Sequence, residues 1–252
     1  MKISGAAAIV TGGGSGLGRA TAEALAGKGA NVAVFDLNPT AAEEAAKAIG
    51  ALALVGDVSD EASANAALAK AEAAHGATRI LVNCAGVGPP KRVVGRDGPH
   101  PLADFERVLR INLVGTFNMI RLVAAAVQKL EPIDGERGVI ISTASVAAFE
   151  GQIGQAAYSA SKGGVVGMTL PIARELAGIG VRINTIAPGI FMTPMLFGLP
   201  QEAQDSLGRS VPNPARLGDP REYAALVVHI CENGYINGET IRIDGALRMA
   251  PR

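Results

Sequence analysis

The chain has 252 residues, of which 48% are hydrophobic and 18% charged. This composition is sufficient for a buried core and excludes intrinsic disorder. Lysine plus arginine equal aspartate plus glutamate at 23 each, which argues against nucleic acid or an anionic membrane surface as the main partner. Two cysteines and three histidines exclude a disulfide framework and argue against a metal site. The longest uncharged run, 183–201, contains three prolines and does not predict a membrane helix. We expect a cytoplasmic protein, or a mitochondrial matrix protein if it is eukaryotic and processed.

Short apolar runs alternate with helical segments along the chain. Apolar runs predict strands at 6–10, 31–35, 51–55, 79–83, 138–142, 181–186 and 239–243. Helices are predicted at 21–28, 39–49, 60–75 and 158–177. Strands that are apolar on both faces and separated by helices are typical of a doubly wound sheet. We therefore predict an α/β fold, a single Rossmann-like domain over 1–252 whose seven-stranded parallel sheet is flanked by helices on both faces.

Two segments break this alternation. Residues 87–101 contain four prolines and predict a loop. Residues 188–220 contain six prolines and predict a long excursion with one short helix around 201–207. Long loops in a compact domain are commonly lids or binding segments, so we expect a substrate lid at about 188–219. Its apolar start, at 191–197, suits an acyl chain, and ordinary core packing is the alternative.

A glycine-rich turn follows the first predicted strand and opens the first helix. Gly12, Gly16 and Gly18 have the spacing GxxxGxG, which permits a tight turn and lets a pyrophosphate approach the backbone. The helix that follows offers free N–H groups and a positive dipole end to phosphates. A glycine-rich turn without a ligand is the alternative. The run Asn83–Gly86 ends the fourth predicted strand, and the order of a doubly wound sheet brings it beside the same cofactor.

Asp36 closes the second predicted strand, eighteen residues beyond Gly18 in the chain. A carboxylate there accepts hydrogen bonds from ribose hydroxyls and repels a 2′-phosphate, and neither Ser15 nor Leu37 supplies a basic group for that phosphate. This favours NAD over NADP, although Asp36 is also suited to a turn at the strand end. Asp57 follows the third strand, where it can accept from an adenine amino group or begin the next helix as a cap.

Tyr158 and Lys162 lie four residues apart on one face of a predicted helix. A fixed cation favours phenolate, and lowering a phenol pKa by about 3 units corresponds to about 4 kcal/mol. By itself such a pair is common on surfaces. Ser145 follows the fifth strand and can face the same crevice, whereas Asn112 is a polar residue inside a helix that needs a partner.

Six motifs occur in one order along the chain: Thr11-Gly-x-x-x-Gly-x-Gly18, Asn83-x-Ala-Gly86, Asn112, Ser145, Tyr158-x-x-x-Lys162 and Pro188-Gly189. Together they resemble the classical short-chain dehydrogenase/reductase family over essentially the whole chain. Within that family, the stretches 143–151, 155–164, 216–220 and 244–249 are similar to the type-2 3-hydroxyacyl-CoA dehydrogenases.

The resemblance implies catalytic roles for four residues. Tyr158 would be the general base, and Ser145 would hold the substrate oxygen. Lys162 would bind the nicotinamide ribose and lower the pKa of Tyr158. Asn112 would anchor a water that links Lys162 to solvent. Gln155 would contact the substrate together with Ser145 and Tyr158.

The resemblance also implies a cofactor site and an assembly. The residues expected to contact NAD are Gly12, Ser15, Gly16, Leu17, Gly18, Asp36, Asp57, Val58, Asn83, Cys84, Ala85, Gly86, Tyr158, Lys162, Pro188, Gly189, Phe191 and Thr193. Cys84 stands where many relatives carry asparagine; we expect backbone contacts from it and no reactive thiol. A homotetramer is expected, with the helix that contains Tyr158 packed against its symmetry mate. No metal is expected.

These features predict NAD-dependent oxidation of a secondary alcohol, with a 3-hydroxyacyl-CoA converted to a 3-ketoacyl-CoA. The alternative enzyme is another short-chain ketoreductase or a hydroxysteroid dehydrogenase. The alternative outside catalysis is a nucleotide-binding scaffold, against which the Asn112, Ser145, Tyr158 and Lys162 set weighs.

Overall fold

The computed structural model describes residues 1–96, 98–197 and 200–251. One seven-stranded sheet runs in the order β3-β2-β1-β4-β7-β8-β9, with every pair of neighbours parallel. Its strands are β1 (Ala7–Thr11), β2 (Asn31–Asp36), β3 (Leu52–Val55), β4 (Ile80–Asn83), β7 (Gly138–Thr143), β8 (Val181–Pro188) and β9 (Thr240–Ile243). The predicted fold class is confirmed. Because strand order reverses beside β1, the crevice at the carboxyl ends of β1 and β4 is the expected ligand site.

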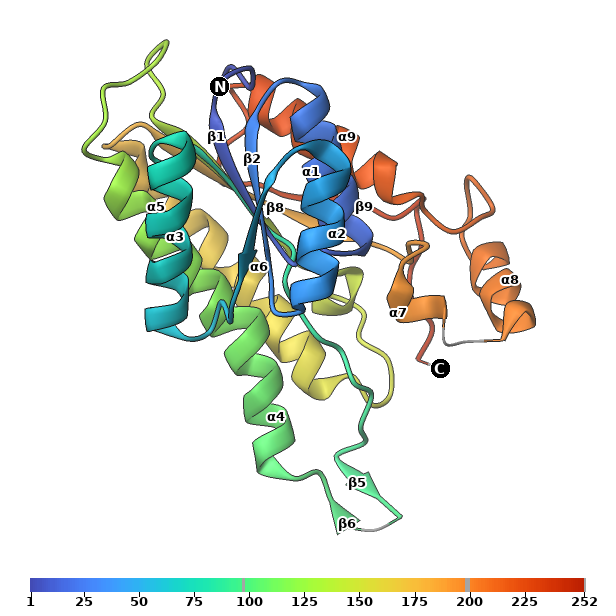
Figure 1. The fold of residues 1–252 in the computed structure, drawn as a ribbon. Helices are drawn as coiled ribbons and strands as arrows, with labels where there is room; N and C mark the ends of the chain where they lie inside the picture. Colours follow the sequence, from blue (N-terminus) through green and yellow to red (C-terminus); the bar gives the residue numbers. More distant parts are fainter. Residues whose placement is uncertain (97, 198–199, 252) are drawn as a thin grey trace.

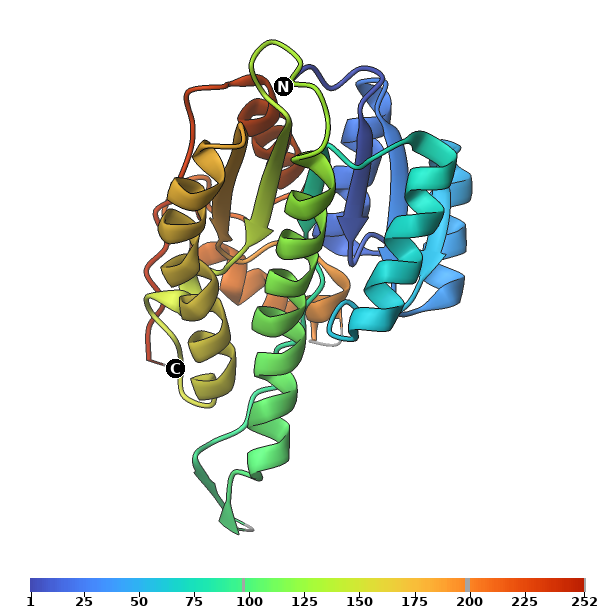
Figure 2. The same ribbon diagram turned by 90° about the vertical axis from the view of Figure 1, so that its left-hand side faces the viewer.

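Helices cover both faces of the sheet (Figures 1 and 2). On one face lie α1 (Gly16–Gly27), α2 (Pro39–Ile49) and α9 (Pro220–Glu232). On the other face lie α3 (Glu61–His75), α5 (Gly115–Val127) and α6 (Ala156–Ala177). The predicted starts and ends agree within two residues, except that α1 begins at Gly16 and not at Thr21. Gly16 and Gly18 have low helix propensity, so the sequence predicts a later start for α1. The turn before the helix nevertheless requires glycine at these positions.

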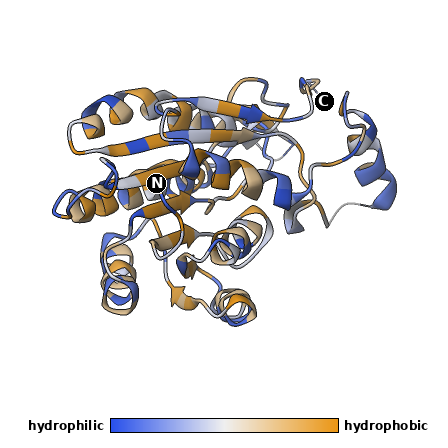
Figure 3. Ribbon diagram, turned by 90° about the horizontal axis from the view of Figure 1, so that it is seen from above, coloured by the Kyte–Doolittle hydropathy of each residue, from blue (hydrophilic) through white to orange (hydrophobic). Residues whose placement is uncertain are grey.

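The core is divided between the two faces by the alternation of side chains along each strand. Ile9 and Leu81 pack in one apolar cluster, whereas Val10 and Val82 pack in the other. Both clusters are closed by helices, which is why the strands are apolar throughout. Figure 3 shows the same distribution, with hydrophobic strands inside and hydrophilic residues concentrated on the outer helix surfaces and on α8 (Gln201–Arg209).

The segment 87–101 was expected to be a loop, and this is wrong in one part. It contains a short antiparallel hairpin formed by β5 (Val94–Gly95) and β6 (Gly98–Pro99), which projects from the body of the domain (Figures 1 and 2). Gly98 has φ of +121°, a conformation that glycine adopts without strain. Asp97 lies outside the described residues.

The excursion after β8 contains α7 (Pro194–Phe197) and α8, so the short helix expected around 201–207 is confirmed. Residues 198 and 199 of the expected lid lie outside the described residues. Two backbone bonds join the ends of the excursion: Met192 N–H donates to Gly218 O at 2.8 Å, and Gly218 N–H donates to Ile190 O at 2.9 Å. The ring of Phe191 covers Gly218 so closely that a Cβ at Gly218 would lie 2.7 Å from it.

A long apolar helical stretch precedes β7. It comprises α4 (Leu102–Leu109), the π-helical turn η1 (Arg110–Val114) and α5. Among the described residues, only this helical stretch is long and apolar enough to cross a membrane, and half of its most apolar part is buried inside the fold. Buried core helices of globular domains have the same length and apolar composition.

Candidate active site

The carboxyl ends of β1, β4 and β7 bring the predicted site residues to one edge of the sheet. The glycine turn follows β1, the run Asn83–Gly86 ends β4, and Ser145 follows β7. Helix α6 carries Tyr158 and Lys162 to the same edge, where Lys162 reaches the end of β7. The structure therefore gathers elements that are distant in the sequence.

The turn after β1 requires glycine at the predicted positions. Gly12 and Gly16 have φ of +60° and +50°, in the left-handed region. A Cβ at Gly12 would lie 2.8 Å from the backbone of Ala85, and a Cβ at Gly18 would lie 2.2 Å from the carbonyl oxygen of Gly12. There is therefore no room for a side chain where the turn passes the loop after β4.

The N-terminus of α1 faces this turn. Ser15 is the N-cap residue, and its side chain makes no capping hydrogen bond. The first N–H groups of the helix consequently lack the side-chain acceptor that usually satisfies one of them. A phosphate fits this arrangement, because free N–H groups and the positive end of the helix dipole point at it. Leu17, the other predicted contact in this turn, is partly buried against the core.

Asp36 holds the same turn from the end of β2. Its Oδ2 accepts a hydrogen bond from Gly14 N at 2.9 Å, and its Oδ1 accepts one from Asn38 N at 3.0 Å. Asp36 therefore does act as a turn residue, as the alternative interpretation proposed. Each carboxylate oxygen keeps a lone pair, so the ribose contact remains a prediction.

The sequence allows two roles for Asp57, an adenine contact or the cap of the following helix. Its Oδ1 accepts from both the backbone N and the Oγ of Ser59, each at 2.8 Å. The cap of α3 is Asp60, whose Oδ1 accepts from Ser63 N at 2.7 Å, so a capping role for Asp57 is wrong. Asp57 instead begins a turn between β3 and α3, in which Asp60 N–H donates to Asp57 O at 3.2 Å. The contacts of Asp57 and the buried Val58 with adenine remain predictions.

The loop after β4 passes close to the catalytic helix. Asn83 is buried, and its Oδ1 has no hydrogen-bond partner among the described residues. The N–H of Ala85 donates to Thr11 Oγ1 at 3.2 Å, which joins this loop to the end of β1. A Cβ at Gly86 would lie 3.1 Å from Asn112 Oδ1 and 3.5 Å from Lys162 Nζ. An orphaned amide oxygen beside a bare glycine turn fits a polar ligand in this crevice.

Cys84 lies in the same loop. Burial raises the pKa of its thiol, so the thiolate is disfavoured. This agrees with the interpretation that Cys84 is not a reactive thiol.

Tyr158 and Lys162 meet as their spacing predicts. Lys162 Nζ lies 5.8 Å from the centroid of the Tyr158 ring. The ammonium is almost fully buried, since Lys162 is 4% exposed, and it donates a hydrogen bond to the carbonyl oxygen of Thr143 at 2.7 Å. The pair is therefore not a surface pair.

The expected lowering of the Tyr158 pKa by Lys162 is not what the structure shows. Burial raises the pKa of Tyr158, and the hydrogen bond with Ser145 opposes this rise. Burial also lowers the pKa of Lys162 to about 8. Both groups lose water when they are buried, and this loss disfavours the phenolate and the ammonium alike. The same burial that raises the Tyr158 pKa therefore also reduces the fraction of Lys162 that is charged.

Ser145 caps the short 3-10 helix η2 (Val146–Ala148). Its Oγ accepts from Ala147 N at 3.1 Å, which fixes the side chain just past the end of β7. The hydroxyl hydrogen is thereby left for the Tyr158 phenol, in agreement with the effect of Ser145 on the Tyr158 pKa. Ser145 and Tyr158 therefore face the same crevice, and the hold of Ser145 on a substrate oxygen remains a prediction.

Asn112 lies in the π-helical turn η1, and such turns are frequent at functional sites. Its Oδ1 accepts from Val87 N, and its Nδ2 donates to Val87 O, each at 2.8 Å. Nδ2 also donates to Ser161 Oγ at 3.0 Å. Both amide hydrogens have protein partners, and Asn112 thus holds the loop after β4 against α6. The water expected at Asn112 remains a prediction.

Two contributors were missed by the sequence analysis. A Cβ at Gly88 would lie 3.2 Å from ring carbons of Tyr158, so this glycine lets the loop cover the phenol. Ser161 donates to Tyr158 O at 2.7 Å and links it to Asn112. The signal for Gly88 is its place just before Pro89 and two residues beyond the run Asn83–Gly86, which was assigned to the site, whereas nothing in the sequence marks Ser161.

The remaining predicted contacts lie after β8 and before α6. A Cβ at Gly16 would lie 3.3 Å from Thr193 Cγ2, so Thr193 is beside the glycine turn. Gly189 packs on Asp244 at the end of β9, which places Pro188 and Gly189 at the same edge of the sheet. Gln155 Oε1 accepts from Gln152 N at 2.9 Å, so part of the side chain shapes its own loop and its substrate contact remains a prediction.

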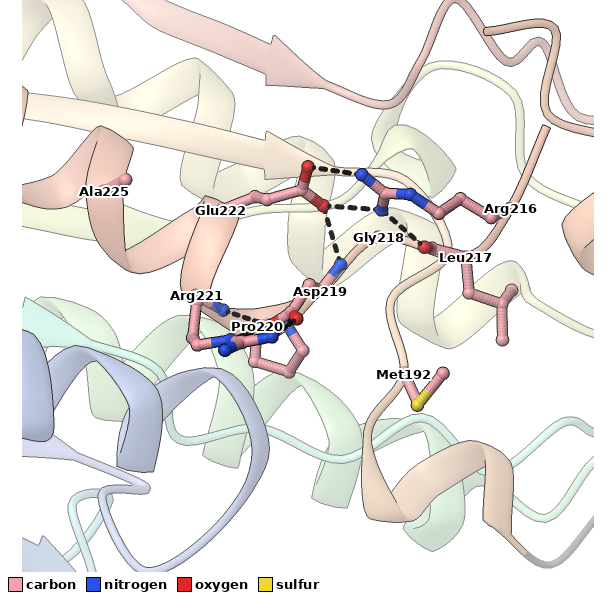
Figure 4. Close-up of a pocket in the computed structure, with 9 residues that line it drawn as sticks. All are labelled: Met192, Arg216, Leu217, Gly218, Asp219, Pro220, Arg221, Glu222 and Ala225. Atoms are coloured by element: carbon pink, nitrogen blue, oxygen red, sulfur yellow. Dashed lines mark hydrogen bonds and ion pairs between the residues drawn. The ribbon is translucent and has the colours of Figure 1, made fainter. Parts of the chain in front are cut away.

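A pocket of about 840 Å³ is lined by residues of the segment after β8 and of α9, and Tyr158 is not among them (Figure 4). Figure 4 shows Arg216 and Glu222 joined by two hydrogen bonds, each 2.8 Å, and Arg221 paired with Asp219. Met192 lies across the opening from these pairs. The charges in this pocket are satisfied by one another, and it contains none of the predicted catalytic groups, so the chemistry belongs to the crevice at the sheet edge.

Comparisons with known proteins agree with this site. A family model described as short chain dehydrogenase matches residues 6–204. The chain is 54% identical to the 3-hydroxyacyl-CoA dehydrogenase type-2 of Homo sapiens, over 99% of this chain and 98% of that protein. It is also 54% identical to the protein of that name from Drosophila melanogaster, over 99% of this chain and 100% of that protein. A crystal structure of 3-hydroxyacyl-CoA dehydrogenase type-2 from Mycobacterium avium superposes with a TM-score of 0.94 at 42% identity, covering 98% of each chain. With its glycine turn, buried lysine and covered phenol at the edge of one parallel sheet, the chain belongs to the short-chain dehydrogenase family.

Proposed function

We propose that the protein oxidises a 3-hydroxyacyl-CoA to the 3-ketoacyl-CoA with NAD. The observation that carries the proposal is the juxtaposition of Ser145, Tyr158 and Lys162 at the sheet edge. The names of the relatives that match 98–100% of their own length support the substrate class. A paired phenol and ammonium serve proton transfer and are not needed to hold a nucleotide, which favours an enzyme over a scaffold.

The residues present fit a dinucleotide. A Cβ at Gly12 or Gly18 would collide with backbone, the first turn of α1 lacks a side-chain acceptor, and Asn83 has an orphaned oxygen. Gly12–Gly18 would hold the pyrophosphate and Asp36 the adenosine ribose, while Lys162 would hold the nicotinamide ribose. When bound, NAD supplies the acceptor for the hydride that leaves the substrate carbon.

The chain's own groups handle the proton and the oxygen. Ser145 Oγ–H donates to the substrate oxygen and orients it toward Tyr158. The phenolate oxygen of Tyr158 accepts the hydroxyl proton, so the substrate loses one proton here and one hydride to NAD, and its C–O bond becomes a carbonyl. Lys162 in its charged form stabilises the phenolate. Gly88 and the loop after β4 exclude water from the ring of Tyr158.

Cofactor choice can be tested at Asp36. In Asp36→Ala, we expect NAD to bind about tenfold to 100-fold more weakly while NADP binding improves or stays unchanged, because both a ribose acceptor and a repulsive charge are removed. Asp36→Asn is the matched control. It keeps one acceptor oxygen for Gly14 N, so it separates loss of the turn from loss of charge. Fluorescence titration with NADH and NADPH gives both affinities, and an unchanged ratio in Asp36→Ala would contradict the role of the carboxylate.

Substrate class can be tested by measuring NADH formation. We expect turnover with (3S)- or (3R)-3-hydroxybutyryl-CoA, the reduced partners of acetoacetyl-CoA, and much lower kcat/KM with a hydroxysteroid or an acyl-carrier-protein thioester. A preference for either of the last two would replace the proposed substrate with that of another ketoreductase or hydroxysteroid dehydrogenase. Binding of NADH without turnover on any of them would favour the scaffold.

We further propose a homotetramer that assembles through α5 and α6. Phe117 and Leu170 are exposed apolar residues on these helices, which lie next to each other on one face in Figure 2. A Cβ at Gly167 would meet nothing within 4 Å, so α6 is bare enough there for a neighbour to approach closely. Light scattering of the purified protein measures the mass.

A cytoplasmic location, or the mitochondrial matrix, is part of the same proposal, supported by two free cysteines that suit a reducing compartment.

A further inference from the structure

Three polar side chains from separate elements meet beneath the catalytic crevice. Tyr223 on α9 is 0% exposed, and its hydroxyl lies 2.7 Å from Thr143 Oγ1 and 3.8 Å from Cys84 Sγ. Thr143 Oγ1 donates to Cys84 Sγ at 3.5 Å. The Tyr223 hydroxyl therefore donates to Thr143, and the cluster joins α9 to the ends of β4 and β7.

Thr143 also serves the catalytic lysine through its main chain. Its carbonyl oxygen is the acceptor of the Lys162 ammonium at 2.7 Å. The side chain of the same residue is held by Tyr223. One residue at the end of β7 thus connects a helix on one face of the sheet, α9, with a helix on the other face, α6.

The phenol oxygen of Tyr223 is costly where it lies. A buried hydroxyl must find a hydrogen-bond partner, whereas a phenylalanine would fill the same space without a polar atom to satisfy. Burial raises the pKa of Tyr223 well above its usual value, so the group stays a neutral hydrogen-bond donor. Its only described polar partners are Thr143 and Cys84, so any effect of the hydroxyl on the site acts through these two residues.

We infer that Tyr223 is a positioning residue for Lys162, because its hydroxyl fixes Thr143 and thereby the carbonyl oxygen that orients the ammonium. This inference rests on the proposed role of Lys162. It goes beyond the four residues of the catalytic set, since Tyr223 touches neither Lys162 nor Tyr158 in the described contacts.

The surroundings of Lys162 make its protonation sensitive to this carbonyl. The titratable groups around the ammonium are Tyr158 on its own helix, Cys84 after β4, and Tyr223 on α9, which acts through Thr143. All three are neutral near pH 7, because burial raises their pKa values. Burial lowers the pKa of Lys162 to about 8. A carbonyl that accepts from the ammonium favours the charged form, so loosening Thr143 should lower the Lys162 pKa further.

The test is the pH titration of Lys162 in Tyr223→Phe, which keeps the ring and removes the hydroxyl. Competitive acetylation with labelled acetic anhydride, followed by mass spectrometry of the peptide that contains Lys162, measures this pKa without any substrate. We expect the midpoint to fall by about 0.5 pH unit, which is about 0.7 kcal/mol at 1.36 kcal/mol per unit. An unchanged midpoint would overturn the inference.

Thr169→Val is the matched control. Thr169 lies on α6, like Lys162, and its Oγ1 makes a buried hydrogen bond of 2.6 Å with Thr185 Oγ1. The variant therefore loses a comparable buried bond, and we expect a similar drop in Tm with no shift in the Lys162 midpoint. If Thr169→Val shifts the midpoint as far as Tyr223→Phe does, the effect reflects general loosening and the inference fails.

Thr143→Val tests the connection itself and replaces Tyr223→Phe should that variant not fold. It keeps the carbonyl and removes the hydroxyl that Tyr223 holds. We expect the same downward shift in Thr143→Val, and no further shift in the double variant, since both changes break one connection. Shifts that add in the double variant would show that the two residues act separately.

Kinetics distinguish failure of the inference from failure of the proposed function. In Tyr223→Phe, the alkaline limb of kcat/KM for alcohol oxidation should move down with the Lys162 midpoint, because the charged lysine is lost at a lower pH. The acid limb should move up, because the Tyr158 phenolate loses support. If the wild-type protein oxidises none of the alcohols above, the proposed function fails, whereas the labelling midpoints still decide the role of Tyr223.

Discussion

Replacement of Tyr158 by phenylalanine is expected to reduce kcat/KM about 10³-fold while the affinity for NADH changes less than about twofold. The variant removes the oxygen that accepts the substrate proton and keeps the ring that packs under Gly88. Steady-state rates at saturating NAD and a fluorescence titration with NADH give the two quantities. The reason for the separation is that the phenol oxygen acts on the reacting hydroxyl, whereas the glycine turn and α1 hold the nucleotide.

Tyr235→Phe is the control for that variant. Tyr235 is 100% exposed, so loss of its hydroxyl should leave both the rate and the affinity at wild-type values. Normal turnover in Tyr158→Phe would remove Tyr158 from the mechanism and with it the need for a charged Lys162. Equal losses of rate and NADH binding would instead show that the ring alone supports the cofactor site.

The second large effect is expected in Gly18→Ala. A Cβ at this position would lie 2.2 Å from the carbonyl oxygen of Gly12, and its nearest neighbours are all backbone atoms of Gly12 and Gly13, so no flexible side chain can move away. The turn after β1 must therefore shift, and we expect NADH affinity to fall at least about 100-fold together with a lower Tm. Isothermal titration and thermal unfolding measure the two effects.

Gly27→Ala provides the comparison within the same helix. Gly27 is the last residue of α1, and a Cβ there would meet nothing within 4 Å. Alanine is favoured over glycine in helices by up to about 1 kcal/mol, so Tm should stay equal or rise while NADH affinity is unchanged. Wild-type affinity in Gly18→Ala would contradict the close-packed turn.

The strands and the glycine turn were predictable because their causes are local. Continuous apolar runs such as 138–142 are needed wherever helices cover both faces of a sheet, and glycine is needed where φ is positive or backbone passes backbone. Tyr158 and Lys162 were predictable because four residues separate neighbours on a helix face. Their burial was not, and it reverses the expected direction of the Tyr158 pKa.

What the sequence could not show depends on contacts between distant elements. Gly88 is one glycine among many until the ring of Tyr158 lies against it. Tyr223 lies in an amphipathic helix, where an aromatic residue is expected to be core, and only the structure reveals that its hydroxyl reaches Thr143. Asp57 is similar, since the choice between cap and ligand depends on where α3 begins.

The segment that is predicted to be a lid is held together at its base. Because residues 192 and 218 are joined by backbone hydrogen bonds and sealed by Phe191, the intervening segment leaves and re-enters the domain at one point. Doubling the length of such a segment costs only about 0.6 kcal/mol in closure entropy. Two further contacts tie the segment to the sheet edge, since Thr193 lies beside Gly16 and Asn213 N–H donates to Gly245 O at 3.2 Å, so insertions that preserve these contacts should leave the glycine turn in place.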